Sequence, residues 1–282
     1  MPGEGLPAER VARVVRAALD EDLGAGDLTT AATVPDNARG RGVLVAKQEL
    51  VVAGLEVAVA AFRALDPATA WQPEGRDGDR FYPGTVIGTV DGRARALLSA
   101  ERVALNFLQR MSGVATQTRR FVEAIAGTGT SIRDTRKTTP LLRFLEKHAV
   151  EIGGGVPHRA GLDSGILVKD NHVRLAGSVR AATRRAVAGA SGLEVEIEVD
   201  DPEQIEEALE AGAGMLLLDN FTPEQVRDAI DQIAGRVPVE VSGGVRLDNV
   251  RAYAEAGPEF IAVGALTHSA PAVDISLEIE PL

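Results

Sequence analysis

The spacing of apolar residues changes character near residue 130, and the chain on either side of that point predicts different structures. Residues 8–20 carry apolar side chains every three or four positions, which predicts an amphipathic helix. A second helical pattern begins at Ser99, a favourable N-cap, and Gly113 is expected to separate it from a third helix at 114–126. The other elements expected in this part are strands at 41–47 and 81–90, a helix at 54–65 and a loop at 66–80.

After residue 130, short apolar runs alternate with helical stretches. The strand-like runs cover residues 131–135, 166–170, 194–199, 215–219, 237–242 and 260–264, and the helical stretches cover 140–151, 172–188, 202–212, 223–234 and 247–256. Alternating strands and helices predict a parallel sheet, and the short repeat favours a barrel over an open sheet. Six such units are fewer than the eight of a complete barrel, so either two strands are missed or the barrel is incomplete.

Glu194, Glu196 and Glu198 alternate with valine and isoleucine along one of these strands. In a barrel whose helices lie outside, the apolar residues of such a strand face the helices and the glutamates point inward. An edge strand with one wet face would show the same pattern. Two other strands carry charge only at their last position, as Lys169 and Asp219, which is where barrels form active sites. Taken alone, Asp219 is equally well explained as a helix cap.

Glycines follow the last two strands of the predicted barrel. Ser242, Gly243 and Gly244 end one strand, and Gly264 ends the other. Barrel phosphate sites commonly use these two loops, because glycines let backbone N–H groups approach the phosphate oxygens. Glycines also end strands for turn reasons alone, so the pattern favours a phosphate site without requiring one.

The distribution of charge points to an anionic ligand. The protein has a net charge of −11, yet residues 133–174 contain eight Arg or Lys against five carboxylates. Cationic groups at strand ends cluster in space and select anions. His158, in the Gly-rich loop 153–165, is either a satisfied loop histidine or a ligand, and its neighbour Arg159 favours the second interpretation. Carboxylates that face a phosphate normally need a mediating cation, and Mg²⁺ fits that role.

Composition excludes several classes of protein. The chain has no cysteine, which leaves no disulfide and no thiolate metal site. A sequence pI near 5.0 argues against binding to nucleic acid. The sequence contains no run of about 18 apolar residues, so we expect no membrane span. Residues 1–5 lack the basic and apolar regions of a signal peptide. We therefore expect a cytoplasmic protein.

Three segments around the cationic region resemble one enzyme family. They are Asp134-Thr-Arg-Lys-Thr-Thr-Pro140, His158-Arg159 followed by Gly161-Leu162, and Lys169-Asp-Asn-His172. Further matching segments are Glu21–Gly24 with Gly26–Thr29, Glu101–Asn106, Ser112–Thr116 and Asp219-Asn220. Together they resemble the quinolinate phosphoribosyltransferases, the carboxylating nicotinate-nucleotide pyrophosphorylases, over nearly the whole chain.

The resemblance implies an α/β fold with an incomplete α/β barrel and an N-terminal α/β sandwich domain. It places the sandwich at residues 1–112, joined by the C-terminal segment 267–282, and the catalytic barrel at 113–266. Residues 273–279 alternate like a strand, in agreement with a chain that returns to the sandwich. The family also implies a head-to-tail homodimer.

The activity implied is transfer of phosphoribosyl from 5-phosphoribosyl 1-pyrophosphate to quinolinate, with decarboxylation to nicotinate mononucleotide, in NAD biosynthesis. Arg102 is expected to reach the site from the partner subunit. The other residues that the resemblance assigns are Arg136, His158 and Arg159 for the two carboxylates of quinolinate, catalytic Lys137 and Lys169 between the substrates, catalytic Glu198 and Asp219 for the ribose and for Mg²⁺ held through water, and Ser242, Gly243, Gly244 and Gly264 for the 5-phosphate.

Three alternatives stay open at this point. A similar paralogous group associated with molybdate transport genes shares the fold and could share the motifs. A non-catalytic barrel could bind anionic nucleotides, and a strand-end lysine such as Lys169 could form a Schiff base. The chain also departs from the family's usual residues at Leu141, Pro157 and 163–165, which flank the motifs and concern the path of the loops.

Overall fold

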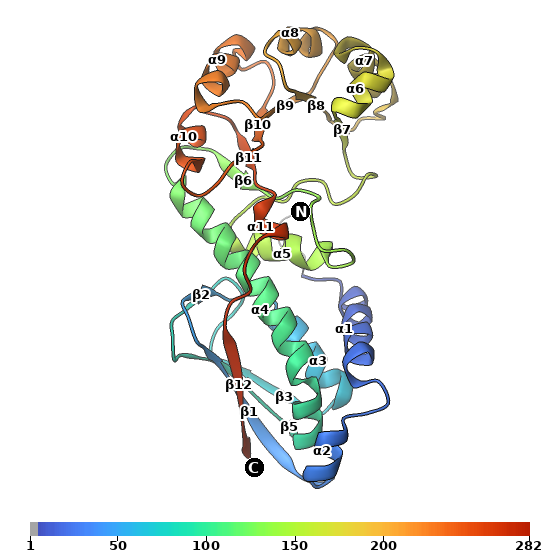
Figure 1. The fold of residues 1–282 in the computed structure, drawn as a ribbon, viewed down its shortest axis with the longest axis vertical. Helices are drawn as coiled ribbons and strands as arrows, with labels where there is room; N and C mark the ends of the chain where they lie inside the picture. The colour runs from blue at the N-terminus through green and yellow to red at the C-terminus, as the bar shows by residue number, and fades with distance from the viewer. Residues whose placement is uncertain (1–4) are drawn as a thin grey trace. The chain divides into compact units, whose positions relative to one another are not determined.

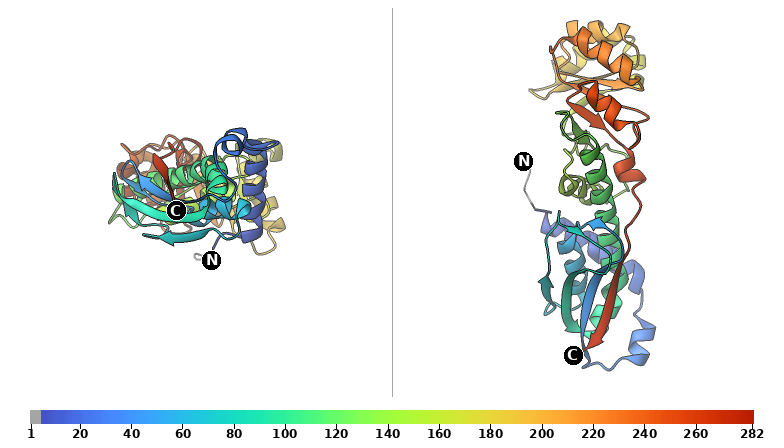
Figure 2. Two further views of the ribbon diagram at one scale, coloured as in Figure 1. Left: turned by 90° about the horizontal axis from the view of Figure 1, so that it is seen from below. Right: turned by 90° about the vertical axis from the view of Figure 1, so that its left-hand side faces the viewer.

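The computed structural model describes residues 5–282, which fall into two compact units. The first unit comprises the chain up to residue 119 together with 138–154 and 267–282, and the second comprises 120–137 and 155–266 (Figures 1 and 2). The expectation that residues 1–5 carry no signal peptide falls almost entirely outside the described residues. Within residues 5–282, no helix is both long and apolar enough to cross a membrane.

The first unit is built on a four-stranded antiparallel sheet with the strand order β12-β1-β5-β3. Its strands are β1 Arg39–Ala46, β3 Ala70–Pro73, β5 Val86–Arg93 and β12 Ile275–Pro281, and β2 Leu50–Val51 pairs separately with β4 Arg80–Phe81. Its helices are α1 Ala8–Leu23, α2 Leu28–Thr33, α3 Leu55–Leu65, most of α4 Ala94–Ala124, and α5 Arg143–Gly153. The predicted return of the chain end is confirmed, because β12 pairs with β1 (Figure 1).

Three expectations for the first unit are wrong, and each error concerns residues whose contacts are distant in the sequence. Ser99 is not an N-cap, because α4 starts five residues earlier and the Ser99 hydroxyl donates to Asp27 at 3.0 Å. Gly113 does not divide the helix. A Cβ at Gly113 would lie 2.1 Å from the carbonyl oxygen of Pro271, so the glycine allows close packing rather than a break. The predicted loop at 66–80 also contains β3.

The second unit contains six parallel strands in the order β6-β11-β10-β9-β8-β7. The strands are β6 Ser131–Arg133, β7 Ile166–Val168, β8 Val195–Val199, β9 Met215–Asp219, β10 Val239–Ser242 and β11 Phe260–Ala262. The helices are α6 Asp170–Ala176, α7 Val179–Gly189, α8 Glu203–Glu210, α9 Pro223–Ile233, α10 Val250–Glu255 and the short α11 Ala265–His268, which starts where this unit ends. The six strands predicted from the sequence are confirmed, and the barrel is incomplete.

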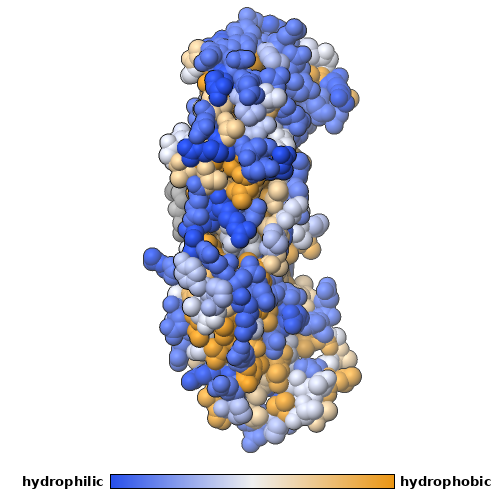
Figure 3. All heavy atoms as spheres, turned by 60° about the vertical axis from the view of Figure 1, so that its left-hand side comes forward, coloured by the Kyte–Doolittle hydropathy of each residue, from blue (hydrophilic) through white to orange (hydrophobic). Residues whose placement is uncertain are grey.

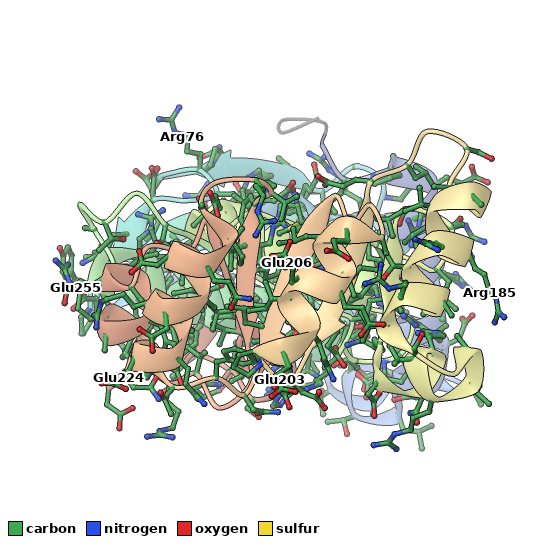
Figure 4. The ribbon with its side chains drawn as sticks, turned by 90° about the horizontal axis from the view of Figure 1, so that it is seen from above. Arg76, Arg185, Glu203, Glu206, Glu224 and Glu255 are labelled. Atoms are coloured by element: carbon green, nitrogen blue, oxygen red, sulfur yellow. The ribbon has the colours of Figure 1, made fainter. Side chains whose placement is uncertain are left out.

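Alternate positions along a barrel strand point to opposite faces, so apolar and polar side chains are separated. In β8, Ile197 and Val199 are fully buried, while Glu196 and Glu198 lie on the opposite face of the strand. The outer helices carry charged residues on their exposed faces, and Glu224 on α9 projects outward in Figure 4. The face of this unit seen in Figure 3 is accordingly mostly hydrophilic. The edge-strand alternative for the glutamates is therefore wrong, because β8 lies between β7 and β9.

The opening between β6 and β7 is spanned by an irregular segment. The Val156 N–H donates to the Ile132 carbonyl at 2.8 Å, and Val156 forms a parallel bridge with Arg133 at the edge of β6. Nine residues later, the Gly165 carbonyl accepts a hydrogen bond from Arg159 just before β7 begins. This segment carries His158 and Arg159 from one edge of the sheet towards the other.

Candidate functional site

A cavity of about 480 Å³ lies at the carboxyl ends of the barrel strands. Eight of the twelve residues assigned from the sequence line it, namely Arg136, Lys137, His158, Arg159, Lys169, Glu198, Asp219 and Ser242. They come from the ends of four strands and from the segments after β6 and before β7. The barrel therefore brings together residues that are up to 106 positions apart in the printed sequence.

Two arginines, Arg136 and Arg159, line the cationic side of the cavity. Burial lowers the pKa of Arg159, the nearby positive charge of Arg136 lowers it further, and Glu196 partly opposes both effects. The Arg159 side chain is anchored by one hydrogen bond to the Gly165 carbonyl at 2.8 Å. Two planar cations held close together form a site that an anion with more than one carboxylate would stabilise.

Lys169 is positioned by the segment that follows it. The Lys169 backbone N–H donates to Nδ1 of His172 at 2.9 Å, so His172 closes the first turn of α6 and fixes the residue before it. The Lys169 ammonium forms an ion pair with Glu198 at the end of β8. The Lys-Asp-Asn-His segment thus folds so that the lysine points to the carboxylate of the neighbouring strand.

Asp219 lies at the end of β9, close enough to Lys169 and Lys137 for their charges to affect it. Burial raises the pKa of Asp219, the negative charge of Glu198 adds to the rise, and Lys169 and Lys137 oppose it. The helix-cap interpretation of Asp219 is wrong, because Thr222 caps α9 through its own hydroxyl. Asp219 is therefore left to face the cavity.

Glu198 and Asp219 offer carboxylate oxygens, the kind of ligand that Mg²⁺ prefers, and the magnesium site expected there stays a prediction. A second cavity of about 340 Å³ is lined by Glu198 and Asp219 together with Asp170 and Asp200. Burial and, after it, the negative charge of Glu198 disfavour the anionic form of Asp219, and a divalent cation would offset both effects. Mg²⁺ takes carboxylate and water oxygens in this way.

The residues predicted for a phosphate site lie in the loops after β10 and β11. Ser242 lines the large cavity, whereas Gly243, Gly244 and Gly264 are not among its lining residues. Gly243 and Gly244 adopt φ angles of +93° and +64°, and a Cβ on Gly243 would lie 2.2 Å from the Asn220 side chain. That turn requires glycine for backbone reasons, so its role towards a phosphate stays a prediction.

Arg102 lies exposed on α4 in the first unit. It belongs to a different unit from the residues that line the cavity. Its expected role in a partner's site therefore stays a prediction.

Sequence reasoning missed a largely buried polar cluster at the wall of the cavity, formed by Arg133, His158, Glu196 and Glu240. Nε2 of His158 lies 3.0 Å from Glu196 and 3.6 Å from Glu240, and Arg133 pairs with Glu240 at 2.8 Å. Burial and the charge of Glu196 raise the pKa of Glu240 to about 7. The alternation in β8 hinted at Glu196. Glu240 stands between two buried valines, and only the register of β10 beside β9 shows that it points inward.

Comparison with known proteins identifies the family. The model of the quinolinate phosphoribosyl transferase C-terminal domain matches residues 114–278, and that of the N-terminal domain matches residues 27–112. The chain belongs to the quinolinate phosphoribosyltransferase family. This confirms the resemblance found in the sequence motifs.

Relatives match over almost their full length. The nicotinate-nucleotide pyrophosphorylase [carboxylating] of Mycobacterium leprae is 44% identical over 271 residues, which cover 94% of this chain and 95% of the relative. A probable enzyme of the same name from Bacillus subtilis is 40% identical over 260 residues, covering 92% and 90%. The crystal structure of NadC from Streptococcus pyogenes superposes with a TM-score of 0.95 at 38% identity, covering 99% of this chain and 100% of that one. The combination of barrel and N-terminal domain is therefore that of the family.

Proposed function

We propose that this protein is a carboxylating nicotinate-nucleotide pyrophosphorylase, which transfers phosphoribosyl from 5-phosphoribosyl 1-pyrophosphate to quinolinate in NAD biosynthesis. The observation that carries the proposal is the presence of Arg136 and Arg159 in one cavity with Lys169, Glu198 and Asp219. The guanidinium pair suits a planar dicarboxylate, and the lysine and carboxylates suit a ribosyl pyrophosphate. Relatives of the same name match along the whole barrel.

The chemistry needs positioning and charge stabilisation more than proton transfer. The pyridine nitrogen of quinolinate attacks C1 of the ribose with its own lone pair, while the bond from C1 to the pyrophosphate oxygen breaks. The positive charge that develops on the ribose would be stabilised by Glu198, and the negative charge on the pyrophosphate by Lys137 and Lys169. Holding both substrates in line in one cavity supplies most of the remaining rate.

Decarboxylation follows from the first step. Once its nitrogen is quaternised, the ring accepts the electron pair released when the bond to the 2-carboxylate breaks, and CO₂ leaves. The ring carbon then takes up a proton to give nicotinate mononucleotide. Arg136 and Arg159 would hold the dicarboxylate during this sequence, because each guanidinium can bind a carboxylate through two parallel hydrogen bonds.

Glu198 and Asp219 would hold Mg²⁺, through water. The ion would neutralise charge on the pyrophosphate leaving group when bound. Lys169 remains paired with Glu198, so its ammonium is retained close to the leaving group. The same ion pair disfavours a Schiff-base mechanism, because a lysine must lose its proton to act as a nucleophile.

The 5-phosphate would bind at Ser242, Gly243, Gly244 and Gly264, and Arg102 would enter the site of a partner subunit in a homodimer. The exposure of Arg102 on α4 supports a role outside its own unit's core. The cytoplasmic location expected from the sequence remains a proposal, supported by the lack of cysteine.

One assay tests the proposal directly. The purified protein is mixed with quinolinate, 5-phosphoribosyl 1-pyrophosphate and Mg²⁺, and nicotinate mononucleotide, pyrophosphate and CO₂ are measured in equal amounts. Replacing Mg²⁺ with a chelator is the control for the metal. Absence of product from the folded protein would contradict the proposed function and would favour the paralogous group or a binding protein.

A further inference from the structure

The buried cluster of Arg133, His158, Glu196 and Glu240 has no role in the chemistry above. The side chain of Glu240 is 0% exposed and that of Glu196 is 8% exposed. Within the described part of the chain, one carboxylate oxygen of each finds no hydrogen-bond partner. Buried carboxylates are costly, so a cluster of this kind indicates a function beyond simple packing.

A metal centre is the first interpretation to consider, because ligand atoms of His158, Glu196 and Glu240 lie within 4.8 Å of one another. The hydrogen bonds of the imidazole argue against it. Nδ1 of His158 accepts the backbone N–H of Arg159 at 2.7 Å, so the ring proton must reside on Nε2. A protonated nitrogen does not bind a metal, and Nε2 instead faces Glu196 at 3.0 Å.

The same hydrogen bonds leave His158 without a free nitrogen for a substrate. Its Nε2–H is directed to Glu196, and its Nδ1 holds the backbone of the next residue. The backbone N–H of His158 is also fixed, because it donates to the buried carboxylate of Asp134 at 2.8 Å. The imidazole thus links β8 to the backbone of the irregular segment that carries Arg159.

We infer that His158 is a positioning residue: Glu196 fixes its ring, and the ring holds the backbone of Arg159 so that the guanidinium faces the carboxylates of quinolinate. This inference rests on the proposed function and reassigns His158 within it, from direct ligand to support. Arg133 and Glu240 complete the support behind the ring. Arg133 stacks on the ring of Phe260, 3.5 Å from its centroid, while it pairs with Glu240.

The need for such a support follows from the charges. Arg136 and Arg159 repel each other, and the segment that carries Arg159 has no helix or strand of its own between β6 and β7. Without a fixed backbone, the two guanidinium groups would separate until a ligand arrived. A rigid support reduces that cost before the ligand binds.

The tautomer of His158 is the first test. The protein has four histidines, so the ring nitrogens can be resolved by ¹⁵N NMR after labelling, with His158→Gln used for assignment. We expect the ring proton of His158 to reside on Nε2 and Nδ1 to act as the acceptor, both alone and with saturating quinolinate. A proton on Nδ1, in either state, would overturn the inference. The spectrum without ligand scores the inference even if quinolinate proves not to be the substrate.

Two pairs of variants provide the second test. Glu196→Gln keeps an oxygen that can accept the Nε2–H, and its KM for quinolinate should stay within about threefold of wild type, whereas Glu196→Ala should raise it by about tenfold or more. In His158→Asn the amide oxygen can replace Nδ1 and accept the Arg159 N–H. In His158→Gln the amide replaces only Nε2, so this variant should bind quinolinate less tightly than His158→Asn. In all four, kcat and the KM for phosphoribosyl pyrophosphate should change less than the KM for quinolinate.

The control is Glu194→Gln, which lies on the same segment as Glu196 but is exposed. It should match wild type in every parameter. If His158→Gln binds quinolinate better than His158→Asn does, Nε2 itself binds the carboxylate, and that result would contradict the inference. If Glu196→Ala does not fold, the comparison of the two His158 variants decides the question.

Discussion

In the first unit, the carboxyl groups of Asp27, Asp66 and Asp91 have pKa values below their usual range, whereas in the second unit those of Asp219 and Glu240 lie above it. The causes differ. Hydrogen bonds from Thr30, from the Arg93 backbone and from Arg41 stabilise the first three as anions. Burial beside another carboxylate destabilises the last two.

The contrast lies between the barrel interior and the rest of the protein. Glu206 on the outer helix α8 behaves like the first unit, because Arg236 binds both its oxygens and lowers its pKa. Among the residues described, the carboxyl groups with resolved upward pKa shifts are those of Asp219 and Glu240. Both belong to the cavity or its buried cluster. This is the pattern expected when a protein keeps electrostatic stress at a functional site.

Two buried glutamates show the same difference at the level of hydrogen bonds. Glu146 in α5 receives two bonds from Arg110 and two from Thr139, so both of its oxygens are satisfied. Glu240 has Arg133 on one oxygen, and its other oxygen finds no hydrogen bond within residues 5–282. The first network holds together distant parts of the first unit, since Arg110 also binds the carbonyl of Ala270. In the second network, burial and the charge of Glu196 destabilise the anionic form of Glu240 beside the cavity.

The largest effect is expected from Lys169→Ala. Removing this ammonium leaves Glu198 unpaired and the pyrophosphate without a cation, so kcat/KM should fall by about a thousandfold or more. The melting temperature should hardly change, because Lys169 is partly exposed. Arg180→Ala, which breaks an exposed ion pair with Glu210 on the outer helices, is the control and should keep full activity. A loss below tenfold for Lys169→Ala would remove it from the catalytic group.

Arg102→Ala should be inactive for a different reason, if Arg102 acts across a dimer. Mixing it with Lys169→Ala under subunit exchange should then form heterodimers with one intact site. Random equal mixing restores about one quarter of wild-type activity. Product formation and native mass spectrometry of the same mixture provide the measurement. Heterodimers without activity would place Arg102 in its own chain's site or outside any site.

Glu146→Ala should affect stability instead of activity. It leaves the Arg110 guanidinium without its buried carboxylate, which should cost about 3 to 5 kcal/mol in the free energy of unfolding. The kcat/KM of the folded fraction should remain within about twofold of wild type, because no residue of the cavity is touched. Urea unfolding followed by an assay in native buffer separates the two quantities. Equal loss of both would mean that the two buried glutamates do not differ in role.

Substrate choice should follow the guanidinium pair. Nicotinate has one carboxylate and would leave one of the half-buried cations Arg136 and Arg159 without an anion. Its kcat/KM should be at least about a hundredfold below that of quinolinate. Competition between the two substrates in a single reaction gives the ratio directly. Comparable values would show that the pair does not recognise two carboxylates.

The smallest effect concerns pH. The pKa of Glu240 is raised to about 7, so its contribution to stability is complete below the usual value near 4.5 and is lost as the pH rises through 7. The groups that face it are Arg133 from β6, Glu196 from β8 and His158 from the segment before β7. Glu240→Gln removes this titration, so its melting temperature should fall less than that of wild type between pH 5 and 8. Parallel curves would contradict the raised pKa.

Much of this architecture was predictable because its signals are local or periodic. Six strand-like runs predicted six strands, and the alternation of Glu196 and Glu198 predicted their direction. The motifs placed Lys169 and Asp219 at strand ends, and the barrel then brought them together. Periodicity suffices when one face of an element is apolar throughout.

The remaining features depend on contacts that no local pattern contains. The continuity of α4 through Gly113 depends on Pro271, more than 150 residues away in the printed sequence. The sequence around Glu240 shows a single charged residue in a buried strand. The direction of its side chain becomes clear only from the neighbouring strands of the sheet. The role of His158 depends on which proton donor meets which nitrogen, and that follows only from the positions of Glu196 and the Arg159 backbone.

The pairing of β12 with β1 has a consequence for synthesis on the ribosome. The ion pair between Lys47 and Glu278, at the end of β1 and within β12, joins residues 231 positions apart. During translation, β1 can pair with β5 soon after both emerge, but its other edge stays open while the whole barrel is made. An unpaired strand edge invites aggregation. The unit that is translated first is therefore the one completed last, and nascent chains released before residue 275 would expose that edge to chaperones and proteases.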